Sequence, residues 1–170
     1  CPLCAGALTL EGGSLRCSGG HCYDLSTKGY LNLAPSHNQA KEKYGAELFA
    51  CRQSVFADGF YQPVADALCD ALSRFAPHTI ADIGCGEGYY LREMAARFPD
   101  TCLIGVDISR DAILAAARQS SAPHWLVADL THLPLKEHSM DALTDVLTPA
   151  DYTAFARVLK PGGVLMKVIP

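Results

Sequence analysis

The stretch of sequence that decides the fold is Thr79-Ile80-Ala81-Asp82-Ile83-Gly84-Cys85-Gly86-Glu87-Gly88-Tyr89-Tyr90. It joins a short apolar run, typical of a buried strand, to a glycine-rich turn and then to a helical pattern over residues 89–97. Glycines at the end of a strand let the backbone approach a ligand, and the following helix N-terminus favours a carboxylate or phosphate. The stretch therefore predicts a ligand site at the carboxyl edge of an α/β sheet.

The alternation of strand and helix continues to the end of the chain. Further strands are expected over residues 102–106, 124–128, 141–146 and 164–169, with helices over 109–118 and 149–159. Ser109 has the position and chemistry of a helix N-cap. Two amphipathic patterns upstream, over 46–57 and 62–75, predict two more helices. Apolar strands with helical crossovers predict an α/β fold, a parallel sheet with helices on both faces.

An acidic residue stands at the end of each of the first three predicted strands: Asp82, Asp107 and Asp129. Asp82 suits an ammonium group, Asp107 the hydroxyls of a ribose, and Asp129 the amino group of an adenine. A dinucleotide fingerprint would require glycine at position 89, where this chain has Tyr89. The three acids beside the glycine turn therefore favour S-adenosylmethionine, and the alternative is that all three only cap helices.

The cysteines are unevenly distributed, because Cys1, Cys4, Cys17 and Cys22 all fall within the first 22 residues. Two closely spaced pairs separated by glycine-containing turns are typical of a closed structural zinc site. A disulfide pair and a redox Cys-x-x-Cys are the alternatives, and neither a secretory signal nor a flanking βαβ unit supports them. The spacing allows either His21 or Cys22 as the fourth ligand.

Composition places these motifs in three segments. Residues 1–36 are expected to form the zinc ribbon, 37–45 a polar linker, and 46–170 the ligand-binding domain. The apolar positions 25, 30, 31 and 33 predict a strand or turn packed on the ribbon. So small a ribbon buries little core, so the affinity for the metal is expected to supply most of its folding free energy.

The overall composition excludes some classes of protein. Apolar residues make up 49% of the chain and charged residues 19%, which is enough for a core and argues against disorder. The formal net charge of −4 gives no electrostatic case for a nucleic-acid partner. No window approaches the ~18 consecutive apolar residues of a membrane span, and no secretory signal is visible. A cytoplasmic protein is the expectation.

Several segments together resemble one family. They are Cys1-Pro2-Leu3-Cys4, Lys28-Gly29-Tyr30, Phe60-Tyr61-Gln62-Pro63, the glycine turn, and Leu159-Lys160-Pro161-Gly162-Gly163. Over essentially the whole chain they resemble the ribosomal RNA large-subunit (23S) guanine-N1 methyltransferases. That family joins a zinc ribbon to a Rossmann-like class I S-adenosylmethionine-dependent methyltransferase domain. The resemblance implies methyl transfer to N1 of a guanine in a ribosomal RNA hairpin loop.

The resemblance also implies which residues act. The family's zinc ligands fall on Cys1, Cys4, Cys17 and His21. The cofactor site implied by the resemblance and by the class comprises Tyr61, Asp82, Gly84, Gly86, Glu87, Gly88, Asp107, Asp129 and Leu130. The chain departs from the family at Leu147, where an aromatic residue is usual, so the choice of target base stays open.

Guanine N1 carries a proton that must be removed, and Asp145 is the nearest candidate base. A solvated helix-cap role explains Asp145 better, so no base is assigned. Lys28, Tyr30, Lys41 and Lys43 are expected to hold the RNA. The family continues beyond residue 170, so we expect the sheet to be incomplete at its C-terminal end and the chain to bind its ligands poorly and to methylate little or nothing. We also expect the edge strand 164–169 to invite self-association, which would make a homodimer.

Two other function classes share part of this pattern. A small-molecule methyltransferase would need the second half of the chain but no zinc ribbon. A zinc-ribbon module that binds RNA or protein, with a non-catalytic methyltransferase half, would keep the cysteines and lose the cofactor residues. Because the cofactor residues are intact, binding of S-adenosylmethionine is the property that discriminates these hypotheses.

Overall fold

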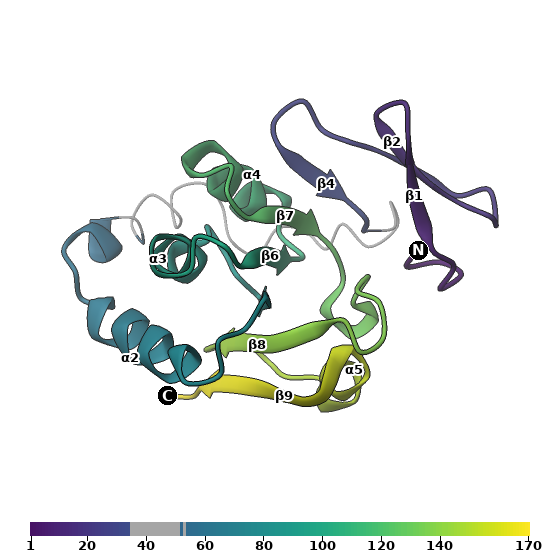
Figure 1. Cartoon of the computed structure of the whole chain (residues 1–170). Coiled ribbons are helices and arrows are strands. Elements are labelled where there is room, and N and C mark those ends of the chain that lie inside the picture. The colour runs from purple at the N-terminus through teal and green to yellow at the C-terminus, as the bar shows by residue number, and fades with distance from the viewer. Residues whose placement is uncertain (35–51, 53) are drawn as a thin grey trace.

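The computed structural model describes residues 1–34, 52 and 54–170, and Figure 1 shows their arrangement. Two sheets are present, one with three strands in the order β1-β2-β3 and one with six in the order β4-β7-β6-β5-β8-β9. The predicted linker 37–45, most of the predicted helix 46–57, and the lysines at 41 and 43 lie outside the described residues. Residues 52 and 54–57 are described as helical.

The N-terminal sheet is a short antiparallel meander. It consists of β1 (Leu8–Glu11), β2 (Ser14–Cys17) and β3 (Cys22–Asp24). β1 and β2 pair with Leu10 opposite Leu15, and β2 and β3 with Leu15 opposite Tyr23. This is the predicted ribbon, and it places the cysteine-bearing turns at one end.

The larger sheet confirms the predicted parallel α/β architecture. Five of its six strands are β5 (Thr79–Ile83), β6 (Cys102–Asp107), β7 (His124–Val127), β8 (Met140–Val146) and β9 (Leu159–Val168), and the sixth is β4. All neighbouring strands run parallel. The chain steps from β5 to β6 and β7 on one side and to β8 and β9 on the other. The carboxyl end of β5 is therefore the topological switch point, where such sheets bind ligands.

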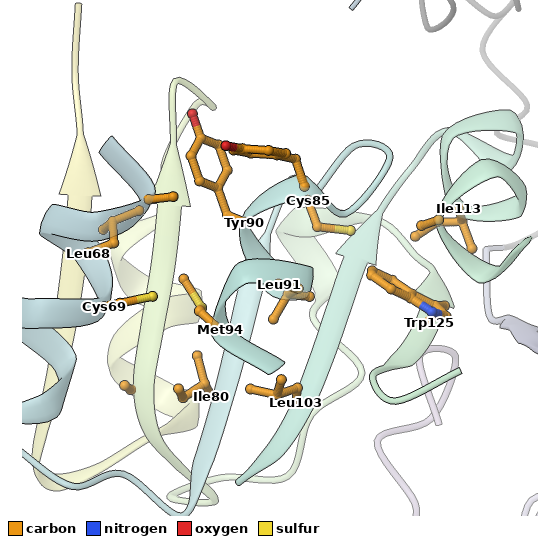
Figure 2. Close-up of a cluster of buried hydrophobic side chains, with 14 of the residues drawn as sticks. Leu68, Cys69, Ile80, Cys85, Tyr90, Leu91, Met94, Leu103, Ile113 and Trp125 are labelled. Atoms are coloured by element: carbon orange, nitrogen blue, oxygen red, sulfur yellow. The ribbon is translucent and has the colours of Figure 1, made fainter. Parts of the chain in front are cut away.

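Helices cover both faces of this sheet. One face packs against α2 (Gln62–Ser73), α3 (Tyr89–Arg97) and α4 (Arg110–Gln119), and Figure 2 shows this apolar core with Leu91, Met94 and Ile113 pointing into it. The other face packs against α5 (Tyr152–Val158), with the short 3₁₀ helix η2 (Leu130–His132) alongside. None of the described helices has the length and hydropathy that crossing a membrane would need.

Two element boundaries differ from the sequence prediction for local reasons. α5 begins at Tyr152 rather than at 149, because the Asp151 carboxylate accepts hydrogen bonds from the amides of Thr153 and Ala154, both at 3.0 Å. The predicted turn at 160–163 lies inside β9, where the pairing register with β8 shifts between Met140 and Ala142. The predicted turn is therefore replaced by an irregularity within the strand.

The strand β4 (Tyr30–Asn32) is the largest difference from prediction. It does not join the ribbon sheet but pairs in parallel with β7, with Tyr30 opposite Trp125, and a single bridge between Leu25 and Leu31 links it back to the ribbon. Leu31 and Leu33 are buried in the core on the α5 side of the sheet, which favours this location. Residues 30–32, expected in the zinc module, thus extend the larger sheet, and the boundaries at 36 and 46 stay predictions.

The buried indole of Trp125 lies between two glycines. A Cβ added to Gly88 or Gly105 would come within 2.3 Å and 2.5 Å of the ring, so only glycine leaves room at either position. The indole Nε1 donates a hydrogen bond to the Ser120 carbonyl at 2.8 Å, and in Figure 2 the ring lies beside Ile113 of α4. The ring therefore joins β7, β6 and the glycine turn in one packed unit.

This packing makes Gly88→Ala strongly destabilising. Alanine at a φ of 75° costs about 1–2 kcal/mol, and forcing the buried ring aside adds about 1–3 kcal/mol. Gly162→Ala is the matched control, because Gly162 has a φ of 80° and no atom within 4 Å of an added Cβ. In denaturant unfolding, we expect Gly88→Ala to lower the free energy of unfolding by about 1–3 kcal/mol more than Gly162→Ala does. Equal losses would mean that the Trp125 ring does not restrict this position.

Candidate functional site

One end of the ribbon gathers four metal-ligating side chains. Cys1, Cys4, Cys17 and His21 each place one ligand atom so that all four lie within 4.8 Å of one another. Cys22, the alternative fourth ligand, is exposed and outside this group. The structure thus brings together the set that the family resemblance implied, and it separates the two adjacent candidates that the spacing left open.

The distances within this cluster fit a tetrahedral zinc ion. The Cys4 and Cys17 sulfurs are 3.6 Å apart, and His21 Nδ1 lies 3.3 Å from the Cys17 sulfur and 3.5 Å from the Cys1 sulfur. Tetrahedral zinc with ligands at ~2.0–2.3 Å would place neighbouring ligand atoms roughly 3.3–3.8 Å apart. Three thiols and an imidazole are also a donor set typical of structural zinc, so the residues present fit the ion.

The surroundings of Cys17 favour its thiolate form, which is the form that binds metal. Burial by itself raises the pKa of this thiol. Hydrogen bonds from the backbone of His21, from the Cys4 and His21 side chains and from the backbone of Gly19 oppose that effect and bring the pKa down to about 7. A Cβ on Gly19 would lie 3.2 Å from the Cys4 sulfur, so the turn is packed closely against the ligands.

Different neighbours explain why each of the three positions 84, 86 and 88 in the turn after β5 is a glycine. Gly84 lies under Thr148, whose side chain would be 2.4 Å from an added Cβ, and Gly88 lies against Trp125. Over Gly86 the nearest atoms are the guanidinium nitrogens of Arg52, at 3.7 Å and 3.9 Å. Gly86 is therefore the position in the turn where a ligand could approach the backbone.

The side chain of Asp82 is almost completely buried at the end of β5. It accepts a hydrogen bond of 2.6 Å from the Thr144 hydroxyl of β8. Burial raises the pKa of Asp82 to about 7, although the Thr144 bond lowers it, and the charges of Asp107 and Asp145 raise it further. A carboxyl with this pKa gains from a neighbouring cation, such as the ammonium of an amino acid.

Asp107, at the end of β6, supports the turn directly. Its two carboxylate oxygens accept hydrogen bonds of 2.8 Å from the backbone amides of Gly86 and Ser109. Burial raises the pKa of Asp107, against these two hydrogen bonds and the nearby Arg52. Each oxygen keeps a further lone pair for a ligand hydroxyl. Asp107 does not cap α4, since Ser109 does so as predicted.

Asp129 acts as a helix cap in this structure. One of its oxygens accepts hydrogen bonds from the Thr131 amide at 2.9 Å and the Thr131 hydroxyl at 2.8 Å, and these hydrogen bonds lower its pKa. The second oxygen lies 4.0 Å from His132. Leu130 follows in η2 and packs partly into the core on the α5 side. Because β5, β6 and β7 are neighbours, the three predicted acids do lie along one edge of the sheet.

Glu87 is buried with both carboxylate oxygens lacking a hydrogen-bond partner among the described residues. Its nearest cation is Arg52, whose Nε lies 3.6 Å from Glu87 Oε1, and Arg92 donates to its backbone carbonyl at 2.6 Å. Arg52 also lies over the Phe56 ring, 5.6 Å from its centre. The sequence analysis missed Arg52, because a single arginine in a helical pattern carries no local signal.

Aromatic rings surround the same turn. Phe56 stacks on Tyr89 with the ring centres 4.3 Å apart and contacts Tyr61 at 5.2 Å. Burial, followed by the nearby Tyr61 and Asp82, raises the pKa of Tyr90 to about 12. Tyr61 is the N-cap residue of α2 and belongs to this aromatic cluster, and its contact with the cofactor stays a prediction.

The expectation of a solvated cap at Asp145 is wrong. Asp145 is fully buried, and Lys167 of β9 donates to its Oδ2 at 2.8 Å and to the Thr148 carbonyl at the same distance. The cap of α5 is Asp151 instead. Register explains the difference, since Asp145 and Lys167 are directly opposite on adjacent strands. The pair holds the loop that carries Leu147, an exposed side chain at a φ of 57°.

The four-ligand cluster predicts that removal of zinc unfolds the ribbon. A strong chelator should unfold β1–β3, because four ligands serve a module with little core, and hydrogen exchange of the amides in residues 8–24 measures this. His21→Ala should weaken zinc binding by more than the roughly 10- to 100-fold that loss of an outer-shell partner costs. The control Cys22→Ser should bind zinc like the wild type. The opposite ranking of the two variants would make Cys22 the ligand.

The raised pKa of Asp82 predicts a pH-dependent stability. The unfolded carboxyl ionises near pH 3.9 and the folded one near pH 7, so between these values the folded state binds more protons. This group's contribution to the free energy of unfolding therefore falls as the pH rises from about 4 to about 7. The free energy of unfolding of the wild type minus that of Asp82→Asn should fall by on the order of 1–2 kcal/mol between about pH 5.5 and 7.5. A constant difference would contradict the raised pKa.

Comparison with known proteins identifies both halves of the chain. The family described as RlmA, N-terminal, a zinc ribbon, matches residues 1–42, and the methyltransferase-domain family matches residues 80–163. An S-adenosylmethionine-dependent methyltransferase of Methanococcus maripaludis, so named provisionally, has a similar solved structure. Its TM-score is 0.58 at 19% identity over 69% of this chain and 62% of that one, which shows the fold.

Two relatives match over the whole chain. A Bacillus subtilis protein with the provisional name 23S rRNA (guanine-N1) methyltransferase is 36% identical, and the 23S rRNA (guanine(748)-N1) methyltransferase of Streptomyces fradiae is 31% identical. The chain spans 63% and 62% of their respective lengths. Zinc and S-adenosylmethionine are accordingly its cofactors. Along its whole length the chain is similar to 23S rRNA guanine-N1 methyltransferases, and it carries a zinc ribbon of the RlmA N-terminal type and a methyltransferase domain.

Proposed function

We propose that this chain transfers a methyl group from S-adenosylmethionine to N1 of a guanine in a hairpin loop of large-subunit ribosomal RNA. The observation that carries the proposal is the four-ligand zinc cluster next to a class I methyltransferase sheet, in a chain that matches relatives of that name along its whole length. A small-molecule methyltransferase has no need of such a ribbon. The alternative of a purely binding module is disfavoured by the intact carboxyl edge of the sheet.

The proposed cofactor site is the set of residues named from the sequence, with Asp82 facing the ammonium group and Asp107 the ribose hydroxyls. Gly86 leaves space for the ligand, and Asp107 holds its amide in place. Asp129 and Leu130, at the end of β7, would contact the adenine. When bound, S-adenosylmethionine supplies a methyl group already activated on a sulfonium, so the protein contributes chiefly by positioning the two reactants.

The residues around the loop after β8 would receive the target guanine. The Lys167–Asp145 pair holds this loop, and exposed Leu147 and Tyr152 lie on either side of Pro149. Tyr152 offers an exposed aromatic face on which a base could stack, in place of the aromatic residue that the family usually carries at 147. The carboxylate of Asp145 is engaged by Lys167, so we assign no base from it.

The zinc ribbon would hold the RNA beside this site. Exposed Lys28 lies in the segment that leads to β4, although the Tyr30 ring expected beside it is buried, and its hydroxyl accepts a hydrogen bond from Arg110 at 2.9 Å. The Tyr30 ring is therefore not available to stack on RNA. With ribosomal RNA as its partner, the protein would act in the cytoplasm. A homodimer stays a prediction, since β9 lies at the edge of the sheet with no outer neighbour among the described strands.

The proposal is tested by transfer of labelled methyl from S-adenosylmethionine to unmodified large-subunit RNA, followed by digestion to nucleosides. We expect the label in 1-methylguanosine. Gly86→Val is the control, since its side chain would occupy the open space over the turn and should reduce labelling by at least about 100-fold, the loss of a few kcal/mol of binding. Label that appears in another nucleoside would contradict the guanine-N1 assignment.

A further inference from the structure

We propose that Arg52 binds the carboxylate of the cofactor's amino-acid portion, and that Glu87 holds the Arg52 side chain in place for this role. The inference rests on the cofactor part of the proposed function and adds a residue from outside the predicted set. It starts from the position of the guanidinium, which covers Gly86, the position in the turn that is open to a ligand.

Glu87 accounts for where the Arg52 side chain lies. The carboxylate of Glu87 is buried, and Arg52 Nε is 3.6 Å from its Oε1, which is an ion-pair distance but too long for a good hydrogen bond. The Phe56 ring supports the guanidinium from another side. These two contacts hold the Nε edge of the guanidinium and leave its two terminal nitrogens near Gly86.

Those terminal nitrogens have unused hydrogen-bonding capacity. Among the described residues, neither Nη atom of Arg52 makes a hydrogen bond, and the Arg52 side chain is about half exposed, at 48%. The planar pair of N–H donors of a guanidinium matches a carboxylate in a bidentate manner. A ligand carboxylate at the turn would therefore satisfy two N–H donors for which the described residues supply no acceptor.

The charge at this edge makes such a cation necessary. Asp82, Glu87 and Asp107 lie together at the ends of β5 and β6, and their carboxylates would repel a further carboxylate. Arg52 is close enough to Asp107 to lower its pKa against the effect of burial. The amino-acid portion of S-adenosylmethionine carries one ammonium and one carboxylate, and the pairing of Asp82 with the first and Arg52 with the second neutralises both.

The test compares two ligands that differ only in this carboxylate: S-adenosylhomocysteine and its decarboxylated analogue, with binding measured by calorimetry. Arg52→Met keeps an unbranched side chain over Phe56 but removes the charge. This variant should lower the affinity for S-adenosylhomocysteine by about 10- to 100-fold, the range for a hydrogen bond to a charged group. Its affinity for the decarboxylated analogue should stay within about twofold of the wild-type value. Arg52→Lys should recover part of the loss. Arg97→Met, which removes an exposed arginine at the C-terminal end of α3 that pairs with Asp66 and Asp70 of α2, should change neither affinity.

Equal weakening of both ligands by Arg52→Met would overturn the assignment, because it would show a general effect on the site instead of a contact with the carboxylate. Unchanged binding of S-adenosylhomocysteine would overturn it as well. Failure of the wild-type chain to bind S-adenosylhomocysteine would refute the cofactor, and with it the proposed function. The two failures are therefore distinguishable in a single set of titrations.

Discussion

The packing of Trp125 between Gly88 and Gly105 is the constraint on which the rest of the structure depends. The indole fills the space that two side chains would otherwise take, so the glycine turn, β6 and β7 can approach only around this ring. Trp125 also stands opposite Tyr30 in the pairing of β7 with β4. The third glycine of the turn is thus required by packing, whereas Gly86 alone faces the space open to a ligand.

The same pairing joins the zinc ribbon to the six-stranded sheet. β4 continues directly from the ribbon, and apolar ribbon residues, Leu8, Leu15 and Tyr23, pack against the core on the α5 side. The Tyr30 hydroxyl accepts a hydrogen bond from Arg110 at the start of α4. The ribbon therefore packs beside the sheet edge formed by β4, next to β7, the strand that leads to Asp129. The structure gives the ribbon a supporting role for the sheet in addition to the RNA contact that we propose.

Buried carboxylates dominate the carboxyl edge of the sheet. Asp82 and Asp107 have raised pKa values because burial disfavours their charged forms, and Glu87 has no hydrogen-bond partner among the described residues. Buried ionisable groups of this kind cluster at functional sites, since their desolvation cost is repaid when a complementary ligand binds. A zwitterionic amino-acid group suits an edge that presents acids together with one arginine. The Lys167–Asp145 pair performs the same neutralisation further along, within the protein itself.

Local patterns in the sequence were sufficient for the strand–turn–helix unit at 79–97, the capping of α4 by Ser109 and the parallel sheet, because these follow from periodicity and turn chemistry within a few residues. They also predicted that Asp82, Asp107 and Asp129 share an edge, since parallel strands end on the same side. Tertiary structure alone decided the partner of β4, the burial of Asp145 against Lys167, and the position of Arg52 beside Glu87. It also grouped His21, and not Cys22, with the cysteines. Each of these depends on the direction of a side chain or on residues far apart in the chain that meet only when the sheet is assembled, and no local pattern encodes such a contact.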